Sequence, residues 1–288
     1  MLKKYIYHDV NFRGTIDRVC YTTHNPEGEL RQKYANLYLP YGYDPTDGKK
    51  YDILYLMHGG GGNPDAWLDC SMVKNMLDYC FSEKLAEPFI VVFPSFYKEQ
   101  ISRIGPPVAD VELQKVLDFS PEVLGELLPA VEKHVRGYAE TLDEEGFRAS
   151  RAHRAFGGFS MGSCTTWFQF IENMPYFSVF LPLSGDCWAV EPRGGGSRPA
   201  ETAEILARAA LDGLKAGYDF RIFAATGSID PAFGSMAPQI EQMKRHPVFA
   251  FSDDPAAGNC HFEVAEGERH AYECVYNYLY SYLPYLFQ

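Results

Sequence analysis

The chain has 288 residues, 46% of them hydrophobic and 15% aromatic, so it can bury a sizeable core. That aromatic content excludes a mainly disordered protein, and no run of about 18 apolar residues predicts a transmembrane helix. The formal net charge of −12 argues against nucleic acid or an anionic membrane as a partner. The composition therefore favours an enzyme or a binding domain.

Apolar, β-branched and aromatic runs alternate with helix-like stretches along most of the chain. Strands are predicted at 14–23, 34–40, 51–59, 88–96, 153–160, 177–185, 219–227 and 260–267. Helices are predicted at 65–83, 110–136, 161–173, 200–215, 233–244 and 271–283. Several strands are nearly unbroken hydrophobic runs, which is typical of a sheet covered by helices on both faces. The alternation predicts an α/β fold around a mostly parallel central sheet.

The remaining segments indicate how these elements connect. No helix separates the first two predicted strands, so we expect them to form an antiparallel N-terminal edge of the sheet. The stretches 136–150 and 190–199 contain residues typical of turns and are predicted to be loops within the fold. No internal repeat and no long linker is present, so we expect one domain over residues 1–288.

Cysteine usage and the N-terminus bear on the compartment. Seven cysteines without a C-x-x-C pair favour unpaired, packed thiols over a disulfide framework or a zinc site. The first residues contain two lysines but no apolar stretch of a secretory signal. We expect either an intracellular protein or one whose signal or neighbouring module was removed before this numbering begins.

The most informative motif is G-F-S-M-G at 158–162, which matches the G-x-S-x-G nucleophile elbow. In this motif a serine occupies a sharp strand-to-helix turn, and the flanking glycines let the strand and the helix pass close to each other. A predicted strand precedes the motif and a predicted helix follows it, as the elbow requires. We therefore predict that Ser160 is a nucleophile; the alternative is a serine in an ordinary turn.

A glycine-rich segment, L-M-H-G-G-G-G at 56–62, follows the strand predicted at 51–59. A phosphate-binding loop would need a G-K-[ST] or a dinucleotide fingerprint, and neither is present. We predict instead that this segment donates one backbone N–H to an oxyanion and that Met161, the residue after the nucleophile, donates another. The alternative is a flexible turn.

A serine nucleophile needs a general base, and in this fold the order along the chain is serine, acid, histidine. Only three histidines follow Ser160: His246, His261 and His270. His261 lies within a predicted strand and is expected to be packed, and His246 follows a predicted helix. His270 lies in the loop between the last strand and the last helix, where the base belongs, so we predict His270.

The acid should lie between the serine and the histidine, just after a strand. Asp230 follows the strand predicted at 219–227 directly, and Asp186 follows the preceding strand. The penultimate strand is the usual location, so Asp230 is preferred and Asp186 remains the alternative. The acid orients the imidazole and stabilises its protonated form.

Together the motifs LMHGGGG, GGFSMGSCTTW, LPLSGDCW, AATGSID and GERHAYECVYNYLYSYLPYLF resemble the feruloyl esterases of carbohydrate esterase family 1. These are esterase D-like α/β-hydrolases found beside xylanase modules, and the resemblance covers roughly residues 30–288. It implies release of ferulic and related hydroxycinnamic acids from plant cell-wall arabinoxylan. It also implies Ser160, Asp230 and His270 as the catalytic triad, with the N–H groups of Gly60 and Met161 as oxyanion donors.

The substrate is less closely defined by the sequence than the reaction. Trp188 and Tyr97 follow strand ends, and Trp67 follows the glycine segment, so all three are expected at the rim of the active site, where they could contact a feruloyl ring. The alternative is that some aromatic residues line any cleft in so aromatic a chain. We expect no metal or organic cofactor. The alternatives to a feruloyl esterase are an acetylxylan or other small-acyl esterase and, more distantly, a non-catalytic carbohydrate-binding scaffold.

Overall fold

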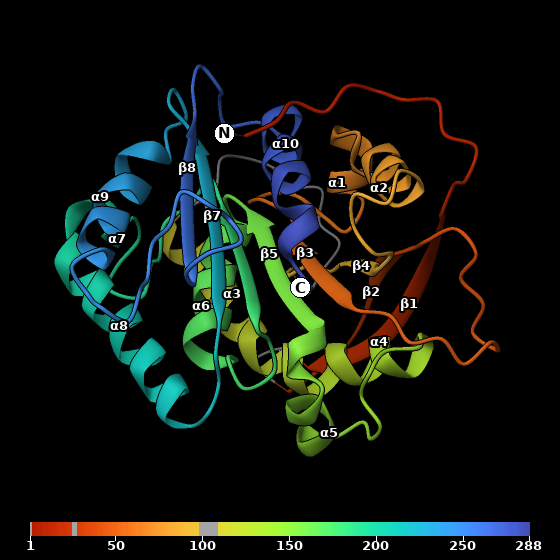
Figure 1. Cartoon of the computed structure of the whole chain (residues 1–288). Helices are drawn as coiled ribbons and strands as arrows, with labels where there is room; N and C mark the ends of the chain where they lie inside the picture. The colour runs from red at the N-terminus through yellow and green to blue at the C-terminus, as the bar shows by residue number, and fades with distance from the viewer. Residues whose placement is uncertain (1, 25–27, 98–108) are drawn as a thin grey trace.

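A central sheet organises the computed structural model, which describes residues 2–24, 28–97 and 109–288 (Figure 1). These residues form one sheet of eight strands in the order β1-β2-β4-β3-β5-β6-β7-β8. The strands are β1 (Thr15–His24), β2 (Leu30–Leu39), β3 (Ile53–Met57), β4 (Ile90–Phe93), β5 (Arg154–Phe159), β6 (Val179–Leu183), β7 (Arg221–Gly227) and β8 (Cys260–Ala265). Each one overlaps a segment predicted to be extended, although β2 begins four residues before the predicted start at residue 34.

The directions of the strands divide the sheet into two parts. β1 pairs antiparallel with β2, with Thr15 opposite Leu39 and His24 opposite Leu30, and β2 pairs antiparallel with β4. All neighbouring pairs from β4 through β3 and β5 to β8 are parallel. The predicted α/β class, with a mostly parallel sheet and an antiparallel N-terminal edge, is confirmed. The carboxyl ends of the parallel strands therefore meet at one edge, where ligands bind in folds of this kind.

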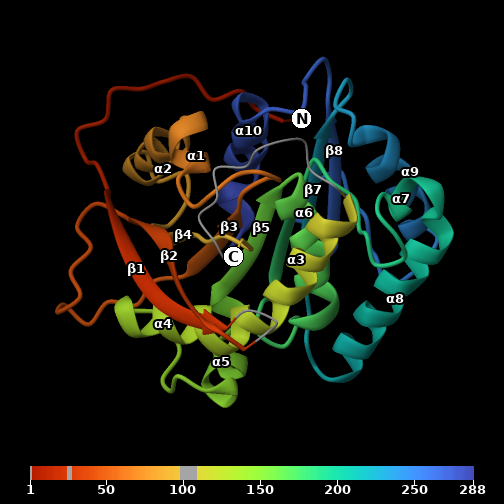
Figure 2. The ribbon, with the colours of Figure 1, turned by 180° about the vertical axis from the view of Figure 1, so that it is seen from behind.

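Helices surround the sheet on both faces (Figures 1 and 2). They are α1 (Ala66–Cys70), α2 (Val73–Ser82), α3 (Ala109–Glu122), α4 (Leu128–His134), α5 (Glu144–Ala149), α6 (Met161–Glu172), α7 (Gly194–Ser197), α8 (Pro199–Lys215), α9 (Phe233–Met243) and α10 (Tyr272–Tyr282). Short 3-10 turns are η2 (Arg151–His153) and η3 (Leu283–Tyr285), and a π-helical turn, η1 (Val123–Leu127), joins α3 to α4. None of the helices in the described ranges is both long and apolar enough to cross a membrane.

The prediction of two plain loops was wrong. The stretch 136–150 contains α5, which begins where the Asp143 carboxylate accepts a hydrogen bond from the Gly146 N–H at 2.9 Å. An aspartate followed by two glutamates is a favourable helix start, because the side chain caps free N–H groups and the acids complement the helix dipole. The stretch 190–199 contains the single turn α7.

Side chains alternate between the two faces of the sheet, so the core has two halves. On β3, Tyr55 and Met57 belong to the half that packs under α3, α6 and α8. Leu54 and Leu56 belong to the half that packs under α1, α2 and α10. This two-sided burial explains why the central strands are continuous apolar runs.

A buried ion pair fixes the start of β5, the strand that leads to the nucleophile elbow. The Arg154 guanidinium donates to Glu132 Oε1 at 2.8 Å, and both side chains are 1% exposed. The same guanidinium donates to the carbonyls of Phe147 and Tyr176 at 2.7 and 3.0 Å. The Glu132 carboxylate thus balances the charge of the Arg154 guanidinium, which the two backbone carbonyls also hold in place.

Replacing one partner of this pair should destabilise the fold strongly. We expect Glu132→Leu to lower the free energy of unfolding in urea by about 3–5 kcal/mol, because Arg154 is left buried and uncompensated. Asp212→Ala is the matched control: it breaks the Lys215–Asp212 pair, whose side chains are 75% and 66% exposed. This control should cost less than about 1 kcal/mol. A similar decrease in the free energy of unfolding in the two variants would contradict this role of the buried ion pair.

Candidate active site

Ser160 stands at a sharp turn between β5 and α6. Its backbone has φ 58° and ψ −115°, a left-handed conformation that residues with a side chain rarely adopt. The turn is held by hydrogen bonds: the Ser160 N–H donates to the Leu183 carbonyl at 3.0 Å, and the Ser160 carbonyl accepts from Cys164 at 3.1 Å. The turn leaves Ser160 partly exposed at the carboxyl end of β5.

The glycines of the elbow are required by close backbone contacts. A β-carbon on Gly162 would lie 2.5 Å from the Met57 carbonyl oxygen and 2.7 Å from that of His58. A β-carbon on Gly158 would lie 2.6 Å from the Gly162 carbonyl carbon. The strand, the helix and the end of β3 therefore approach each other without room for a side chain, which is the physical reason for the G-x-S-x-G spacing.

Ser160, His270 and Asp230 form a continuous chain of hydrogen bonds. His270 Nε2 lies 2.8 Å from Ser160 Oγ, and His270 Nδ1 lies 2.7 Å from Asp230 Oδ1. Asp230 is 3% exposed, and an ionised carboxylate can only accept, so Nδ1 carries the proton. Nε2 is then free to accept the Ser160 hydroxyl proton, which is the arrangement that a general base needs.

The alternative acid and base contact other groups. The Asp186 carboxylate accepts from the Trp188 indole N–H at 3.1 Å and from the Gly195 N–H at 2.9 Å, and burial raises its pKa. His261 is 4% exposed, and its Nδ1 lies 2.8 Å from the Ser252 carbonyl oxygen. The geometry thus brings Asp230, and not Asp186, to His270.

The glycine segment forms a tight turn beside Ser160. The Gly62 N–H donates to the Gly59 carbonyl at 3.0 Å, and Gly61 has φ 75°. Gly60 lies against Met161: a β-carbon on Gly60 would be 3.1 Å from Met161 Cγ. Met161 is the first residue of α6, and the first N–H groups of a helix have no intrahelical acceptor. The two expected oxyanion donors therefore lie on neighbouring segments beside Ser160.

The buried side chain of His58 contacts this turn through the Gly59 carbonyl. It is buried, and burial lowers its pKa to about 4, so its imidazole is neutral near pH 7. One ring nitrogen lies 2.7 Å from the Gly59 carbonyl oxygen and the other 2.8 Å from Ser95 Oγ. Since a carbonyl only accepts, Nδ1–H donates to Gly59, and Nε2 accepts from Ser95.

Two cavities formed by described residues flank Ser160, and both are lined in part by Ser160 and His270. The smaller, of about 230 Å³, is lined mainly from the loops after β6 and β7, and Trp188 forms part of its wall. The larger, of about 810 Å³, runs along Gly59–Gly62 and the starts of α1 and α10. An ester bound at Ser160 can therefore extend in two directions.

The three aromatic residues expected at the rim differ in their surroundings. Trp67 is 1% exposed, and its indole N–H donates to the Met57 carbonyl at 3.0 Å, so it belongs to the core. The Tyr97 hydroxyl contacts the glycine turn, and Tyr97 is not among the described residues that line the two cavities. Of the three, Trp188 lines the smaller cavity next to Ser160.

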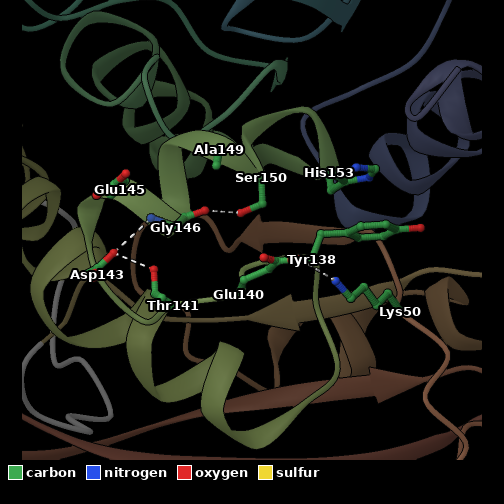
Figure 3. Close-up of a pocket in the computed structure, with 10 residues that line it drawn as sticks. All are labelled: Lys50, Tyr138, Glu140, Thr141, Asp143, Glu145, Gly146, Ala149, Ser150 and His153. Carbon is green, nitrogen blue, oxygen red and sulfur yellow. Dashed lines mark hydrogen bonds and ion pairs between the residues drawn. The ribbon is translucent and has the colours of Figure 1, made fainter.

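A third cavity, of about 550 Å³, is lined by residues that precede β5, whereas Ser160 follows that strand. Figure 3 shows the side chains that line this cavity. Its wall includes Lys50 and His153, which precede β3 and β5, and the Tyr138 ring stacks on His153 with ring centroids 3.4 Å apart. This cavity contains none of the predicted catalytic side chains. In the described part of the chain, no group of three or more histidine, cysteine or acidic side chains is arranged to hold a metal.

The sheet order, the elbow and the Ser160–His270–Asp230 chain define an α/β-hydrolase. No family model matches the chain. It is 39% identical over 275 residues to endo-1,4-beta-xylanase Y of Acetivibrio thermocellus. This alignment covers 95% of this chain and 23% of that protein. It is 30% identical over 188 residues to an endo-1,4-beta-xylanase/feruloyl esterase of Xylanibacter ruminicola, covering 64% of this chain and 23% of that protein. The chain thus spans about a quarter of the length of these relatives.

A solved structure gives the family. The feruloyl esterase module from Clostridium thermocellum, a serine-to-alanine mutant complexed with sinapinate, superposes with a TM-score of 0.80 at 35% identity. The match covers 100% of this chain and 96% of that one. This chain therefore belongs to the feruloyl esterases of carbohydrate esterase family 1, and the resemblance found in the sequence is confirmed.

Because the backbone contacts in the elbow are so close, adding one methyl group at Gly162 should strongly reduce activity. We expect Gly162→Ala to lower kcat by at least about 10²-fold, because the new β-carbon must displace the end of β3 or the start of α6 and move Ser160 Oγ. Gly125→Ala is the control, since no atom lies within 4 Å of a β-carbon there. Full activity of a folded Gly162→Ala variant, judged by circular dichroism and ester hydrolysis, would contradict this view of the elbow.

Proposed function

We propose that this chain is a serine esterase that releases ferulic and related hydroxycinnamic acids from arabinoxylan. The observation that carries the proposal is the Ser160–His270–Asp230 hydrogen-bond chain beside a cavity walled by Trp188. The relatives named for feruloyl esterase activity, and the module complexed with sinapinate, support the same substrate class.

The proposed reaction is acyl transfer in two halves. His270 Nε2 takes the Ser160 hydroxyl proton as Oγ attacks the ester carbonyl, and Asp230 stabilises the imidazolium that forms. The N–H groups of Gly60 and Met161 hold the negative charge on the carbonyl oxygen. The alcohol then leaves with the proton from His270, and water hydrolyses the acyl-enzyme by the same steps.

The smaller cavity suits the acyl group. Met161, Cys164 and Trp188 supply apolar and aromatic surface, while Ser184 and Arg193 supply polar groups. A hydroxycinnamoyl group is a flat ring with polar substituents, which matches an apolar pocket that carries a few polar groups. An acetyl group would fill only a small part of a volume of about 230 Å³.

The larger cavity suits the alcohol side of the ester. Asn63, Asp69 and Glu273 are exposed along it, and their amide and carboxylate groups can hydrogen-bond to sugar hydroxyls. The alcohol remains attached to a polysaccharide, so its site has to be open at the surface. We further propose that the chain acts beside a xylanase module, since it aligns with part of two longer xylanases.

Removing the nucleophile tests the reaction. We expect wild type to release ferulate from methyl ferulate and Ser160→Ala to lose about 10⁶-fold in kcat, because a triad without its nucleophile cannot form the acyl-enzyme. An acetyl ester is assayed in parallel. Cleavage of the acetyl ester alone would leave the mechanism and overturn the hydroxycinnamoyl substrate; activity retained by Ser160→Ala would overturn the mechanism.

Changing the cavity wall tests the acyl site. We expect Trp188→Ala to raise KM for methyl ferulate by about 3- to 10-fold, since an aromatic pair contributes about 0.5–1.5 kcal/mol beyond its buried area. KM for a small acetyl ester should change little. Trp188→Phe is the control, because it keeps a ring but removes the indole N–H that binds Asp186. Equal effects of Trp188→Ala on both esters would contradict the assignment of this cavity to the acyl group.

A further inference from the structure

The backbone N–H groups of the glycine turn are distributed among several acceptors. The Gly62 N–H closes the turn on the Gly59 carbonyl at 3.0 Å. The Gly59 N–H donates to the Tyr272 hydroxyl at 3.0 Å, and the Gly61 N–H donates to the Tyr97 hydroxyl at 2.7 Å. The N–H of Gly60, between them, is the one expected to face the substrate. Two tyrosines therefore hold the residues on either side of the predicted oxyanion donor.

Tyr272 connects the turn to the segment that carries the base. It is the first residue of α10, two positions after His270. Its ring packs edge-on against Trp67, with centroids 5.1 Å apart, and against Phe159, with centroids 4.8 Å apart. Burial raises the pKa of Tyr272, so the hydroxyl stays protonated. A neutral oxygen with a fixed ring is thus held against the Gly59 N–H.

Tyr97 holds the other side of the turn from the loop after β4. Its hydroxyl accepts from Gly61 and donates to the carboxylate of Glu112, a side chain that is 1% exposed. The Tyr97 ring lies against the His58 ring, with centroids 5.6 Å apart, and under the Lys115 ammonium at 4.7 Å. The hydroxyl is therefore fixed by a buried acceptor on one side and by its ring contacts on the other.

We propose that Tyr97 and Tyr272 are positioning residues for the oxyanion site: their hydroxyl oxygens fix the Gly59 and Gly61 N–H groups so that the Gly60 N–H points at the reacting carbonyl oxygen. This inference rests on the proposed function, because it assumes that Ser160 attacks an ester. A run of four glycines is intrinsically loose, since glycine adopts many backbone conformations. Fixing it before the reaction matters because an oxyanion donor is effective only when it is already oriented.

The proposal predicts that loss of either hydroxyl weakens stabilisation of the transition state, and so lowers kcat, without weakening substrate binding. We expect Tyr97→Phe and Tyr272→Phe each to lower kcat about 10-fold, with KM for methyl ferulate within about twofold of wild type. The double variant should approach the loss of about 10²–10³-fold that follows removal of one oxyanion donor. An arylboronic acid, whose tetrahedral adduct on a serine places an oxygen in the oxyanion site, should bind more weakly by the same factor as kcat/KM falls.

Tyr278→Phe is the matched control. It lies on the same helix, α10, is 1% exposed, and its hydroxyl has no hydrogen-bond partner in the described part of the chain. Removing that hydroxyl should change neither kcat nor boronic acid binding. Rates are normalised to active sites counted with a fluorophosphonate, so that a fraction of misfolded protein does not count as lost catalysis.

The outcomes separate the two proposals. Wild-type kcat and wild-type boronic acid affinity in both tyrosine variants would overturn the positioning role, and so would losses that vanish on normalisation to active sites. If Ser160→Ala is inactive in the same assay while the tyrosine variants are fully active, only the positioning role fails. Activity that survives in Ser160→Ala would overturn the proposed function, and the positioning role with it.

Discussion

The turn at Ser160 is a strained piece of backbone on which the other parts of the site depend. A residue with a side chain at φ 58° costs of the order of 1–3 kcal/mol and persists only where its surroundings fix it. Here they do so with a hydrogen bond to the carbonyl of Leu183 on β6 and with the close approach of Gly162 to the end of β3. The completely buried Trp167 anchors α6 on the other side of the turn. Ser160, the glycine turn and the N-terminus of α6 are therefore placed by one set of contacts.

The sheet brings the remaining groups to the same point. Asp230 follows β7 and His270 follows β8, and because both strands run parallel to β5, their carboxyl ends lie at the edge where Ser160 stands. The hydrogen bond between His270 and Asp230 joins residues 40 positions apart, and that between His270 and Ser160 joins residues 110 apart. Residues so far apart in the sequence keep these distances only if the strands that carry them are rigid. The core packed on both faces of the sheet makes the strands rigid.

The sequence was sufficient for the strands, because each central strand is apolar on both faces and is bounded by turn residues. The four helices α6, α8, α9 and α10 agree with the prediction to within one residue at each end. The predicted helix at 65–83 is instead two helices, α1 and α2, and that at 110–136 is α3, η1 and α4. Local composition did not reveal the first break, since α1 ends without a glycine or proline. The second break lies next to a proline that the prediction passed over, because α3 ends one residue after Pro121.

The positions of the candidate site residues followed from the sequence where a motif fixes both the place of a residue and the direction of its side chain, and less well elsewhere. Ser160, Asp230 and His270 were each predicted from the elbow and from the order of strands, and the structure joins the three side chains by hydrogen bonds. Trp67 and Tyr97 were expected at the rim because they follow strand ends, but that position does not say where a side chain points. Trp67 reaches a backbone carbonyl in the core, and Tyr97 reaches the glycine turn. The contact of Tyr272 with the glycine turn was not predicted, although its place two residues after His270 offered a signal.

The central claim is that an ester acylates Ser160, and mass spectrometry of the intermediate tests it most directly. Wild-type protein is mixed with methyl ferulate, quenched in acid before the steady state, digested and analysed for modified peptides. The account predicts one feruloyl group on the peptide that contains Ser160, formed in a burst and lost as ferulate appears. Rapid ferulate release with no covalent intermediate at any time, or a feruloyl group on a different residue, would contradict it.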